Sequence, residues 1–162
     1  MLTPLRLYPT LLILVGAGSL VFAWTAQYGF DLEPCILCLY QRVPFGVVAI
    51  LGLIGLVRPQ WLLLVFALAT AAFAINSGIA FYHFGVEQHW WVSAAGCGGG
   101  DVPKQLSAAD ILASLNAAPP PKACDAVDWT FLGISMAGWN IVFSGGLAVI
   151  AGYITKTRKW GA

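Results

Sequence analysis

Long apolar stretches separated by short polar segments dominate the pattern of hydrophobic and polar positions along the chain. They cover approximately residues 7–28, 36–57, 61–84 and 131–153. A helix needs about 20 mostly apolar residues to cross the hydrocarbon core of a bilayer, so each stretch is long enough to span it. The pattern predicts an all-α fold, a single four-helix transmembrane domain over residues 1–162 in the lipid bilayer.

Composition supports a membrane location. Hydrophobic residues make up 59% of the 162 residues and charged residues only 9%, which leaves too few polar side chains to coat a soluble globule of this size. The formal net charge is +1. Such a near-neutral balance argues against nucleic acid as a partner.

The distribution of charge predicts the orientation in the membrane. Acidic residues are absent from the N-terminus, the turn between the second and third spans, and the C-terminal tail, but basic residues occur there: Arg6, Arg58, Lys156, Arg158 and Lys159. Lys and Arg accumulate in short cytoplasmic segments, so both termini are predicted to be cytoplasmic. The other two loops carry all seven acidic residues and are predicted to face outward. All four cysteines then face the compartment where disulfides persist.

The second outer loop, residues 85–129, is the one long polar segment. In it, Ser107 and Asp110 are spaced like a capping box, and Ile111, Leu112 and Leu115 follow on roughly one helical face. We therefore expect a short helix here, lying at the membrane surface.

Small and polar residues inside the spans predict how the helices pack. Helices in lipid associate through close backbone approach and polar contacts. A stripe of small residues marks one face of the third span: Ala67, Ala71, Ala74 and Gly78. Interhelical hydrogen bonds are expected from four polar side chains: Asn76, Ser77, Asn140 and Ser144.

Cys35 and Cys38 form a C-x-x-C at the outer start of the second span, directly after Pro34. Proline suits the first position of a helix, so Cys35 is expected in the first turn, where unpaired amides and the helix dipole favour a thiolate. Residues i and i+3 of a helix lie close enough for a disulfide, so this pair can form a bond and give it up. Thiols in this position can pass electrons into the bilayer only to a lipid-soluble acceptor such as a quinone.

Arg42 follows Cys38 by four residues and so projects from the same helix face, one turn deeper. An arginine within a span is costly and usually functional. Here it can stabilise a Cys38 thiolate and the negative charge that develops on a quinone oxygen. The alternatives are snorkelling to the headgroups and pairing with an outer-loop carboxylate.

Cys97 and Cys124, in the long outer loop, allow two interpretations. Taken alone, they favour a structural crosslink. Beside an outward-facing C-x-x-C, a second redox pair is favoured, because disulfide exchange needs an accessible bond and Gly98–Gly100 give the chain freedom. A zinc site made of four cysteines fits the count, but no second C-x-x-C matches the first, so we predict no metal.

His83 and Glu87, with His89, fall at the outer end of the third span. They could border a quinone or pass protons to it. For any one of them alone, an interfacial position without chemistry is the simpler interpretation.

The motif Pro34-Cys-Ile-Leu-Cys-Leu-Tyr-Gln-Arg42, the order of the four cysteines, and Asp128-Trp-Thr-Phe-Leu-Gly133 followed by Met136 and Trp139 together resemble the DsbB family. The resemblance covers nearly the whole chain. It implies a membrane thiol oxidase, a protein-disulfide:quinone oxidoreductase of the bacterial inner membrane, whose partner is a periplasmic DsbA-like thiol oxidase and whose cofactor is ubiquinone or menaquinone.

The resemblance also implies the roles of individual residues. The disulfides would be Cys35–Cys38 and Cys97–Cys124. Reduced partner would form a mixed disulfide with Cys97, and Cys124 would then attack Cys35, leaving Cys38 as the thiolate against the quinone. Arg42 would assist this last step. The quinone would be bound by Cys38 and Arg42. From their position at the outer end of the third span, His83 and Glu87 are expected beside it.

Two alternatives stay open. A vitamin K epoxide reductase-like protein is also a bundle with a C-x-x-C facing a quinone, but in that family the loop cysteines precede the C-x-x-C, whereas here Cys35 and Cys38 come first. The other alternative is a non-catalytic tetraspan scaffold with structural disulfides. That interpretation leaves Arg42 and the C-x-x-C spacing unexplained.

Overall fold

The computed structural model describes residues 4–95, 97 and 122–157. Its elements are α1 (Pro4–Gly29), α2 (Ile36–Val57), the short 3-10 helix η1 (Pro59–Trp61), α3 (Leu62–Glu87), β1 (Thr130–Phe131), β2 (Ile134–Ser135) and α5 (Met136–Thr157). Four helices in this part of the chain are long and apolar enough to cross a membrane. The predicted all-α, four-helix membrane fold is confirmed, and the chain is a multi-pass membrane protein.

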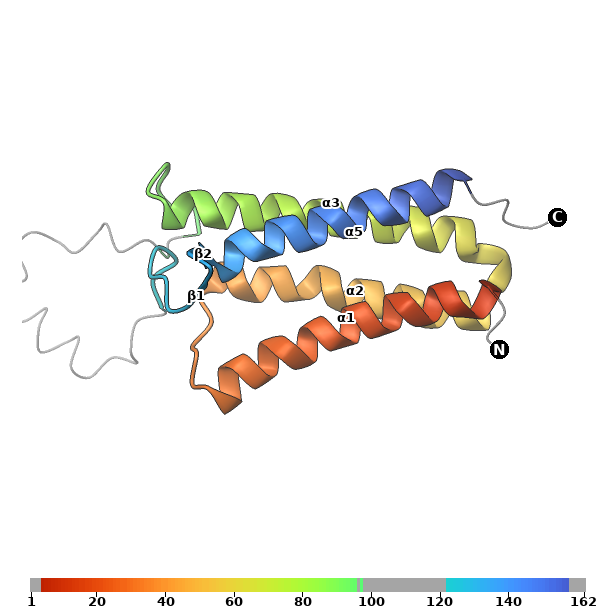
Figure 1. Cartoon of the computed structure of the whole chain (residues 1–162), viewed down its shortest axis with the longest axis horizontal. Helices are drawn as coiled ribbons and strands as arrows, with labels where there is room; N and C mark the ends of the chain where they lie inside the picture. Colours follow the sequence, from red (N-terminus) through yellow and green to blue (C-terminus); the bar gives the residue numbers. More distant parts are fainter. Residues whose placement is uncertain (1–3, 96, 98–121, 158–162) are drawn as a thin grey trace, which may run out of the picture.

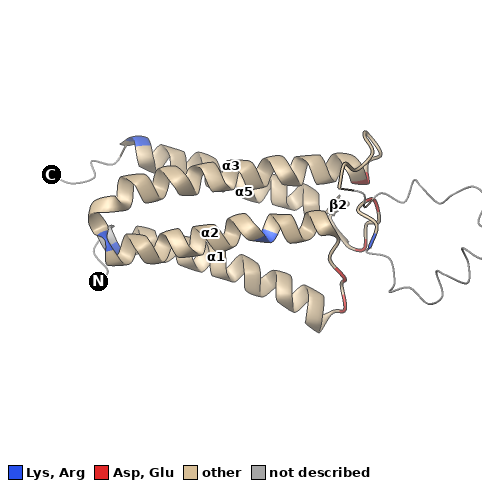
Figure 2. Cartoon of the chain, turned by 180° about the vertical axis from the view of Figure 1, so that it is seen from behind, with Lys and Arg blue, Asp and Glu red and all other residues tan. Residues whose placement is uncertain are grey.

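The four long helices run alongside one another as a bundle (Figure 1). One end of the bundle contains the end of α1 and the starts of α2 and α5, and the acidic residues of the described chain lie there (Figure 2). Basic residues gather at the opposite end, with two exceptions: Arg42, the single basic residue of α2, and Lys122, which lies at the acidic end and pairs with Asp128. This separation agrees with the charge pattern from which we predicted cytoplasmic termini, and the sidedness itself stays a prediction.

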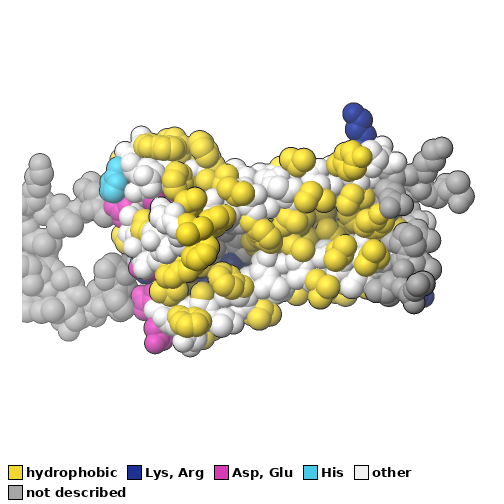
Figure 3. All heavy atoms as spheres, in the orientation of Figure 1, with side chains coloured by type: hydrophobic (Ala, Val, Ile, Leu, Met, Phe, Trp, Pro, Cys, Tyr) yellow, Lys and Arg dark blue, Asp and Glu magenta, His cyan; other side chains and the backbone are white. Residues whose placement is uncertain are grey.

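Large apolar side chains cover much of the outer surface of the helices (Figure 3). Leu14 of α1, Val43 of α2 and Val149 of α5 are each more than 60% exposed. In water such a surface would be costly, whereas in lipid the helices satisfy their own backbone polar groups and leave apolar side chains facing the acyl chains.

Helices α1 and α2 pack most closely at two glycines. A Cβ atom on Gly16 would lie 2.5 Å from the Phe45 carbonyl, and one on Gly52 would lie 2.8 Å from the Pro9 carbonyl. Glycine therefore permits the backbones to touch here. Toward the acidic end of the bundle α1 diverges from α2, and both views show this separation (Figures 1 and 2).

Helices α3 and α5 are joined by buried polar side chains. Asn76 Nδ2 donates to Ser144 Oγ at 2.8 Å and to Asn140 Oδ1 at 3.3 Å, and Ser77 Oγ donates to the Ile141 carbonyl at 3.1 Å. The predicted interhelical hydrogen bonds are confirmed. The apolar core lies nearer the basic end, where Phe45, Phe66 and Phe73 belong to one buried cluster.

The predicted packing stripe of α3 was wrong. All four of its small residues lie on the exposed face: Ala67, Ala71, Ala74 and Gly78. The neighbouring face, with Ala69, Ala72 and Ala80, is buried instead. The reason is that this face also carries Phe73, which packs in the core, and Asn76, which donates a hydrogen bond to α5. Rotating α3 to bury the predicted stripe would remove both contacts.

The start of the fourth span also differs from the prediction. Residues 130–135 form an antiparallel hairpin in which Thr130 pairs with Ser135, and α5 begins only at Met136. Leu132 and Gly133 connect the strands with φ of 53° and 77°, as a two-residue hairpin turn requires. The apolar pattern of residues 131–153 therefore did not reveal the turn at Leu132 and Gly133. The predicted surface helix around Ser107–Leu115 lies outside the described residues.

Candidate redox site

Cys35 is the N-cap residue of α2, one position before the first turn in which the sequence placed it. Its Sγ accepts a hydrogen bond from the Cys38 backbone N at 3.4 Å and lies 3.2 Å from Cys38 Sγ. A disulfide bond is about 2.05 Å long, so in this structure the pair consists of two thiols. The Cys35–Cys38 disulfide implied by the resemblance is thus not formed here, although the sulfur atoms are already neighbours.

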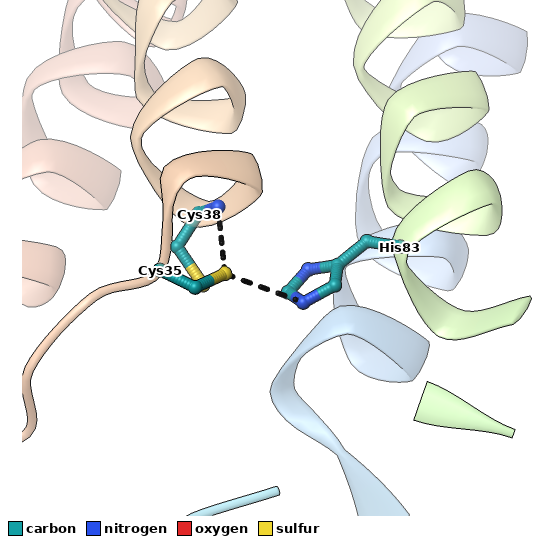
Figure 4. Close-up of side chains that lie close together, drawn as sticks. All are labelled: Cys35, Cys38 and His83. Atoms are coloured by element: carbon teal, nitrogen blue, oxygen red, sulfur yellow. Dashed lines mark hydrogen bonds between the residues drawn. The ribbon is translucent and has the colours of Figure 1, made fainter. Parts of the chain in front are cut away.

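His83 projects from α3 toward this cysteine pair (Figure 4). Its Nε2 lies 3.5 Å from Cys35 Sγ and 3.2 Å from the Cys124 carbonyl oxygen. The residue is only 4% exposed. The ring therefore lies between the C-x-x-C and the loop cysteine Cys124.

The environment of Cys35 favours its thiolate. The hydrogen bond with the Cys38 side chain lowers the pKa of Cys35 to about 4, and His83 adds to this by hydrogen bonding and by charge, while burial works in the opposite direction. The N-terminal end of α2 contributes in the same sense, because the Cys38 backbone amide donates to the sulfur.

Gln41 orients the His83 ring from the opposite side. Its Nε2 donates to the Leu37 carbonyl at 3.2 Å and lies 3.0 Å from His83 Nδ1. Its Oε1 accepts a hydrogen bond of 2.6 Å from Asn140. With the amide in this orientation, Nδ1 is an acceptor and Nε2 carries the proton that faces Cys35.

Cys97 and Cys124 are joined by a disulfide. The Cys124 backbone N donates to the Cys97 carbonyl, and Ser93 Oγ lies 3.0 Å from Cys97 Sγ. Both cysteines are buried in one cluster with Cys35, Leu37 and Val86, against which Cys38 packs. The fold therefore places the two cysteine pairs side by side.

Arg42 lies within the membrane-spanning part of α2 and is held by α1. Its Nη1 donates to Gln27 Oε1 at 2.7 Å, and its Nη2 donates to the Ala23 carbonyl at 3.4 Å. These partners differ from both alternatives considered above, the headgroups and an outer-loop carboxylate. The guanidinium is therefore kept inside the bundle.

Glu87 borders the same region at the end of α3. It accepts a hydrogen bond from the Ser135 hydroxyl of the hairpin, and its Oε1 lies 3.8 Å from His83 Nε2. His89, in contrast, has a side chain that is 77% exposed and lies 3.9 Å from Asp125. The structure thus separates His83 and Glu87, which face the cysteines, from His89, which does not.

A cavity of about 680 Å³ adjoins the cysteine pair. Its wall contains Cys38, Arg42, His83 and Glu87. The remainder is largely apolar and comes from α1, α2, α5 and the segment before the hairpin, as with Phe22, Phe45, Trp139 and Phe143. Sites of about 300–1,000 Å³ with apolar walls and a few polar groups suit small organic ligands, so these residues fit a flat, lipid-soluble ring with polar edges.

The sequence analysis did not single out three residues of the site: Gln27, Gln41 and Ser135. Each falls within a predicted span, where a polar residue is itself a signal for a site, and Gln41 also precedes Arg42 in the motif. The roles of Gln27 and Ser135 could not be inferred, because they depend on which helix end or hairpin lies opposite Arg42 and Glu87.

A multi-pass bundle with two adjoining cysteine pairs and a thiol-lined cavity belongs to the class of membrane thiol-disulfide proteins. Residues 5–154 match the family of the disulfide bond formation protein DsbB. Similar proteins, each named disulfide bond formation protein B, occur in several bacteria. That of Histophilus somni (strain 129Pt) is 31% identical over 138 residues, covering 80% of this chain and 76% of that protein.

The protein of that name from Xylella fastidiosa (strain 9a5c) is 32% identical over 155 residues, covering 88% of this chain and 86% of that protein. The one from Xanthomonas campestris pv. campestris (strain 8004) is 30% identical over 150 residues, covering 86% and 84%. The chain therefore belongs to the DsbB family and is an oxidoreductase of disulfide bond formation.

Proposed function

We propose that the chain is a membrane thiol oxidase that reoxidises a periplasmic DsbA-like thioredoxin-fold protein and passes the electrons to a membrane quinone. One observation carries this proposal: the thiols of a C-x-x-C and a guanidinium within the bilayer region line the same apolar cavity. A purely structural pair of cysteines needs neither the cation nor the cavity. Membership of the DsbB family supports the same conclusion.

The first step is thiol–disulfide exchange with the partner, a reaction for which the DsbA–DsbB couple is a standard example. A thiolate of the reduced partner attacks Cys97, the Cys97–Cys124 bond breaks, and Cys124 leaves as a thiolate. The second thiol of the partner then displaces Cys97. The partner gains a disulfide, and Cys97 and Cys124 keep its two electrons and two protons.

The second step moves these electrons between the cysteine pairs. Cys124 attacks an oxidised Cys35–Cys38 bond at Cys35, Cys38 leaves, and Cys97 then displaces Cys35, so the loop disulfide forms again. The burial of both pairs in one cluster supports this transfer. A Cys97–Cys124 disulfide beside reduced Cys35 and Cys38 corresponds to the state that follows it.

In the third step the reduced pair, Cys35 and Cys38, is oxidised again. A quinone bound in the cavity would accept the two electrons and two protons that Cys35 and Cys38 give up as their disulfide forms. Arg42, fixed by Gln27, offers guanidinium donors to the acceptor, and Cys38 lies one turn away on the same helix. His83 Nε2 stabilises the Cys35 thiolate. His83 and Glu87 are neighbours at the cavity wall, and either side chain can carry a proton.

In this proposal ubiquinone or menaquinone is the acceptor, the protein lies in the bacterial inner membrane with both termini cytoplasmic, and the cysteines face the periplasm. The chain order, with Cys35 and Cys38 before Cys97 and Cys124, favours this role over a vitamin K epoxide reductase-like one.

A direct assay tests the function. Reduced thioredoxin-fold partner and a soluble quinone are added to the purified protein, and quinol formation is followed by absorbance. We expect catalytic turnover with the unmodified chain and none with Cys38→Ser. Quinol formation at the unmodified rate in Cys38→Ser would refute the route, and its absence with the unmodified chain, folded and supplied with both substrates, would favour the scaffold alternative.

A further inference from the structure

Three potential metal ligands converge where α2 faces α3. Sγ of Cys35, Sγ of Cys38 and Nε2 of His83 all lie within 4.8 Å of one another. The first two are 3.2 Å apart, and His83 Nε2 is 3.5 Å from Cys35 Sγ (Figure 4). The three residues come from two different helices, so the cluster results from the tertiary fold and not from the C-x-x-C alone.

These distances suit a tetrahedral ion. With Zn–S of about 2.3 Å and Zn–N of about 2.0 Å, neighbouring ligand atoms of a tetrahedral zinc site lie roughly 3.5–3.8 Å apart. The observed separations need only small side-chain movements to reach this range. Two thiolates and an imidazole are also the ligand types that zinc prefers over carboxylate-binding ions such as Mg²⁺.

We propose that the reduced form of the protein binds zinc through Cys35, Cys38 and His83, and that the oxidised form does not. All three residues line the cavity, so the fourth coordination position faces it and is left to water. Zinc sites with two cysteines, one histidine and an open position are known in proteins. This inference differs from the four-cysteine zinc site that the sequence disfavoured, because Cys97 and Cys124 are joined to each other and take no part.

Redox state controls the proposed site. A zinc ion replaces the protons of the Cys35 and Cys38 thiols and releases them to solvent, with no electron transferred. Once these sulfurs form a disulfide, they no longer provide thiolates and two of the three ligands are lost. Bound zinc therefore holds the pair reduced and prevents its return to the disulfide.

Gln41 must adapt when the ion binds. In the metal-free structure its amide nitrogen faces His83 Nδ1, which leaves the proton on Nε2. A metal on Nε2 shifts that proton to Nδ1, and a ligating histidine usually donates this second N–H to an oxygen acceptor. Rotation of the Gln41 amide brings its Oε1 to Nδ1, so Gln41→Glu, which always presents an oxygen, should bind the metal more tightly than Gln41→Leu.

Cobalt(II) provides a spectroscopic test. Purified full-length protein in detergent, with Cys35 and Cys38 reduced and the Cys97–Cys124 bond intact, is titrated with Co²⁺, and thiolate-to-cobalt charge-transfer absorption is recorded. We expect one equivalent of Co²⁺ to bind and Zn²⁺ to displace it. The same protein after oxidation of Cys35 and Cys38 should give no such bands, and this comparison needs no substitution and no change of fold.

Variants identify the ligands. Cys38→Ser should abolish the charge-transfer bands, and His83→Ala should weaken binding by more than the roughly tenfold that loss of an outer hydrogen-bond partner costs. His89→Ala is the matched control, because it removes the other histidine, which is exposed, and it should bind as the unmodified protein does. Equal binding by the oxidised protein, full-strength binding by His83→Ala, or no bands at stoichiometric Co²⁺ would each overturn the proposal. Because the assay contains neither partner nor quinone, its result is independent of the proposed oxidase activity.

Discussion

Arg42 of α2 donates a 2.7 Å hydrogen bond to Gln27 of α1, and this contact connects the two helices. The glutamine side chain and the Ala23 carbonyl together hold the guanidinium within the bundle. A cation in this position is pre-oriented before any ligand arrives, so it does not have to be reorganised when charge develops on that ligand.

Loss of Arg42 should impair the use of quinone and spare the exchange with the partner. For Arg42→Ala we expect kcat/KM for quinone to fall by roughly 100-fold, the size of effect seen when one charge-stabilising donor is removed. Quinone reduction by reduced partner, measured by absorbance at varied quinone concentration, checks this.

Gln27→Leu is the companion variant, since it removes the partner of Arg42 and keeps the cation. It should lower kcat/KM for quinone by a smaller factor than Arg42→Ala does. Both variants should still form the mixed disulfide between Cys97 and the partner. Failure to form it would show that Arg42 acts on the loop cysteines or on the fold.

Cys124→Ser should accumulate the mixed disulfide between Cys97 and the partner. Cys97 is a free thiol in this variant, so its thiolate attacks the disulfide of oxidised partner and one partner sulfur leaves as a thiol. No Cys124 thiolate is present to displace the partner from Cys97. Non-reducing gel electrophoresis after mixing with oxidised partner measures the adduct. Cys97→Ser serves as the control and should give no adduct through Cys124, and equal adducts from the two variants would contradict the assigned order.

The reactivity of Cys35 should persist to low pH. The thiolate is the reactive form, so alkylation of reduced Cys35 should stay near its maximal rate as pH is lowered from neutrality and decline only as pH falls through about 4. Mass spectrometry of the alkylated peptide, in a variant with Cys97 and Cys124 replaced by serine, gives the rate at each pH.

Removal of the hydrogen-bonding partners of Cys35 should raise its pKa. The Cys38 side chain is the largest cause of the low value and His83 a further one, so Cys38→Ala should shift the alkylation profile to higher pH more than His83→Ala does. Profiles that coincide with the parent protein in both variants would show that neither side chain controls the thiolate.

Helix packing between α1 and α2 should tolerate no side chain at Gly52. Its added Cβ would lie within 3 Å of Ile13 and of the Pro9 carbonyl, and overpacking of this kind costs about 1–3 kcal/mol of stability. Gly52→Ala should therefore lower the melting temperature in detergent. Gly146→Ala is the matched control, because nothing lies within 4 Å of its Cβ position, and a similar loss there would disprove the packing argument.

The helices and the cysteine-bearing helix start could be predicted from sequence because they depend on local signals. These signals are the length of each span, Pro34 before Cys35, and the four-residue interval from Cys38 to Arg42, and each acts within one turn or one helix. The hairpin at Leu132–Gly133 was missed because an apolar run conceals a turn whose signal is a single glycine. The α3 face was predicted wrongly because small residues occur on both of its faces, and only contacts with α5 decide between them.

The reactive side chains of the site could be predicted from the sequence, but the side chains that position them could not. The sequence indicated Cys35, Cys38 and Arg42, and it grouped His83 with Glu87 without showing which direction either faces. Whether His83 contacts a cysteine depends on the rotation of α3 relative to α2, which no local pattern records. The same holds for Gln41, whose contacts with His83 and Asn140 join three helices.

Helix α1 diverges from the rest of the bundle, and the cavity is lined by residues of α1 such as Ala23 and of α5 such as Phe143. Figure 3 shows a hollow in the side of the bundle. A hollow on the side of a membrane-spanning bundle opens toward acyl chains. In the proposed function, a long-tailed quinone inserts its head group through this hollow by diffusing in the plane of the membrane, while its tail stays among the lipids.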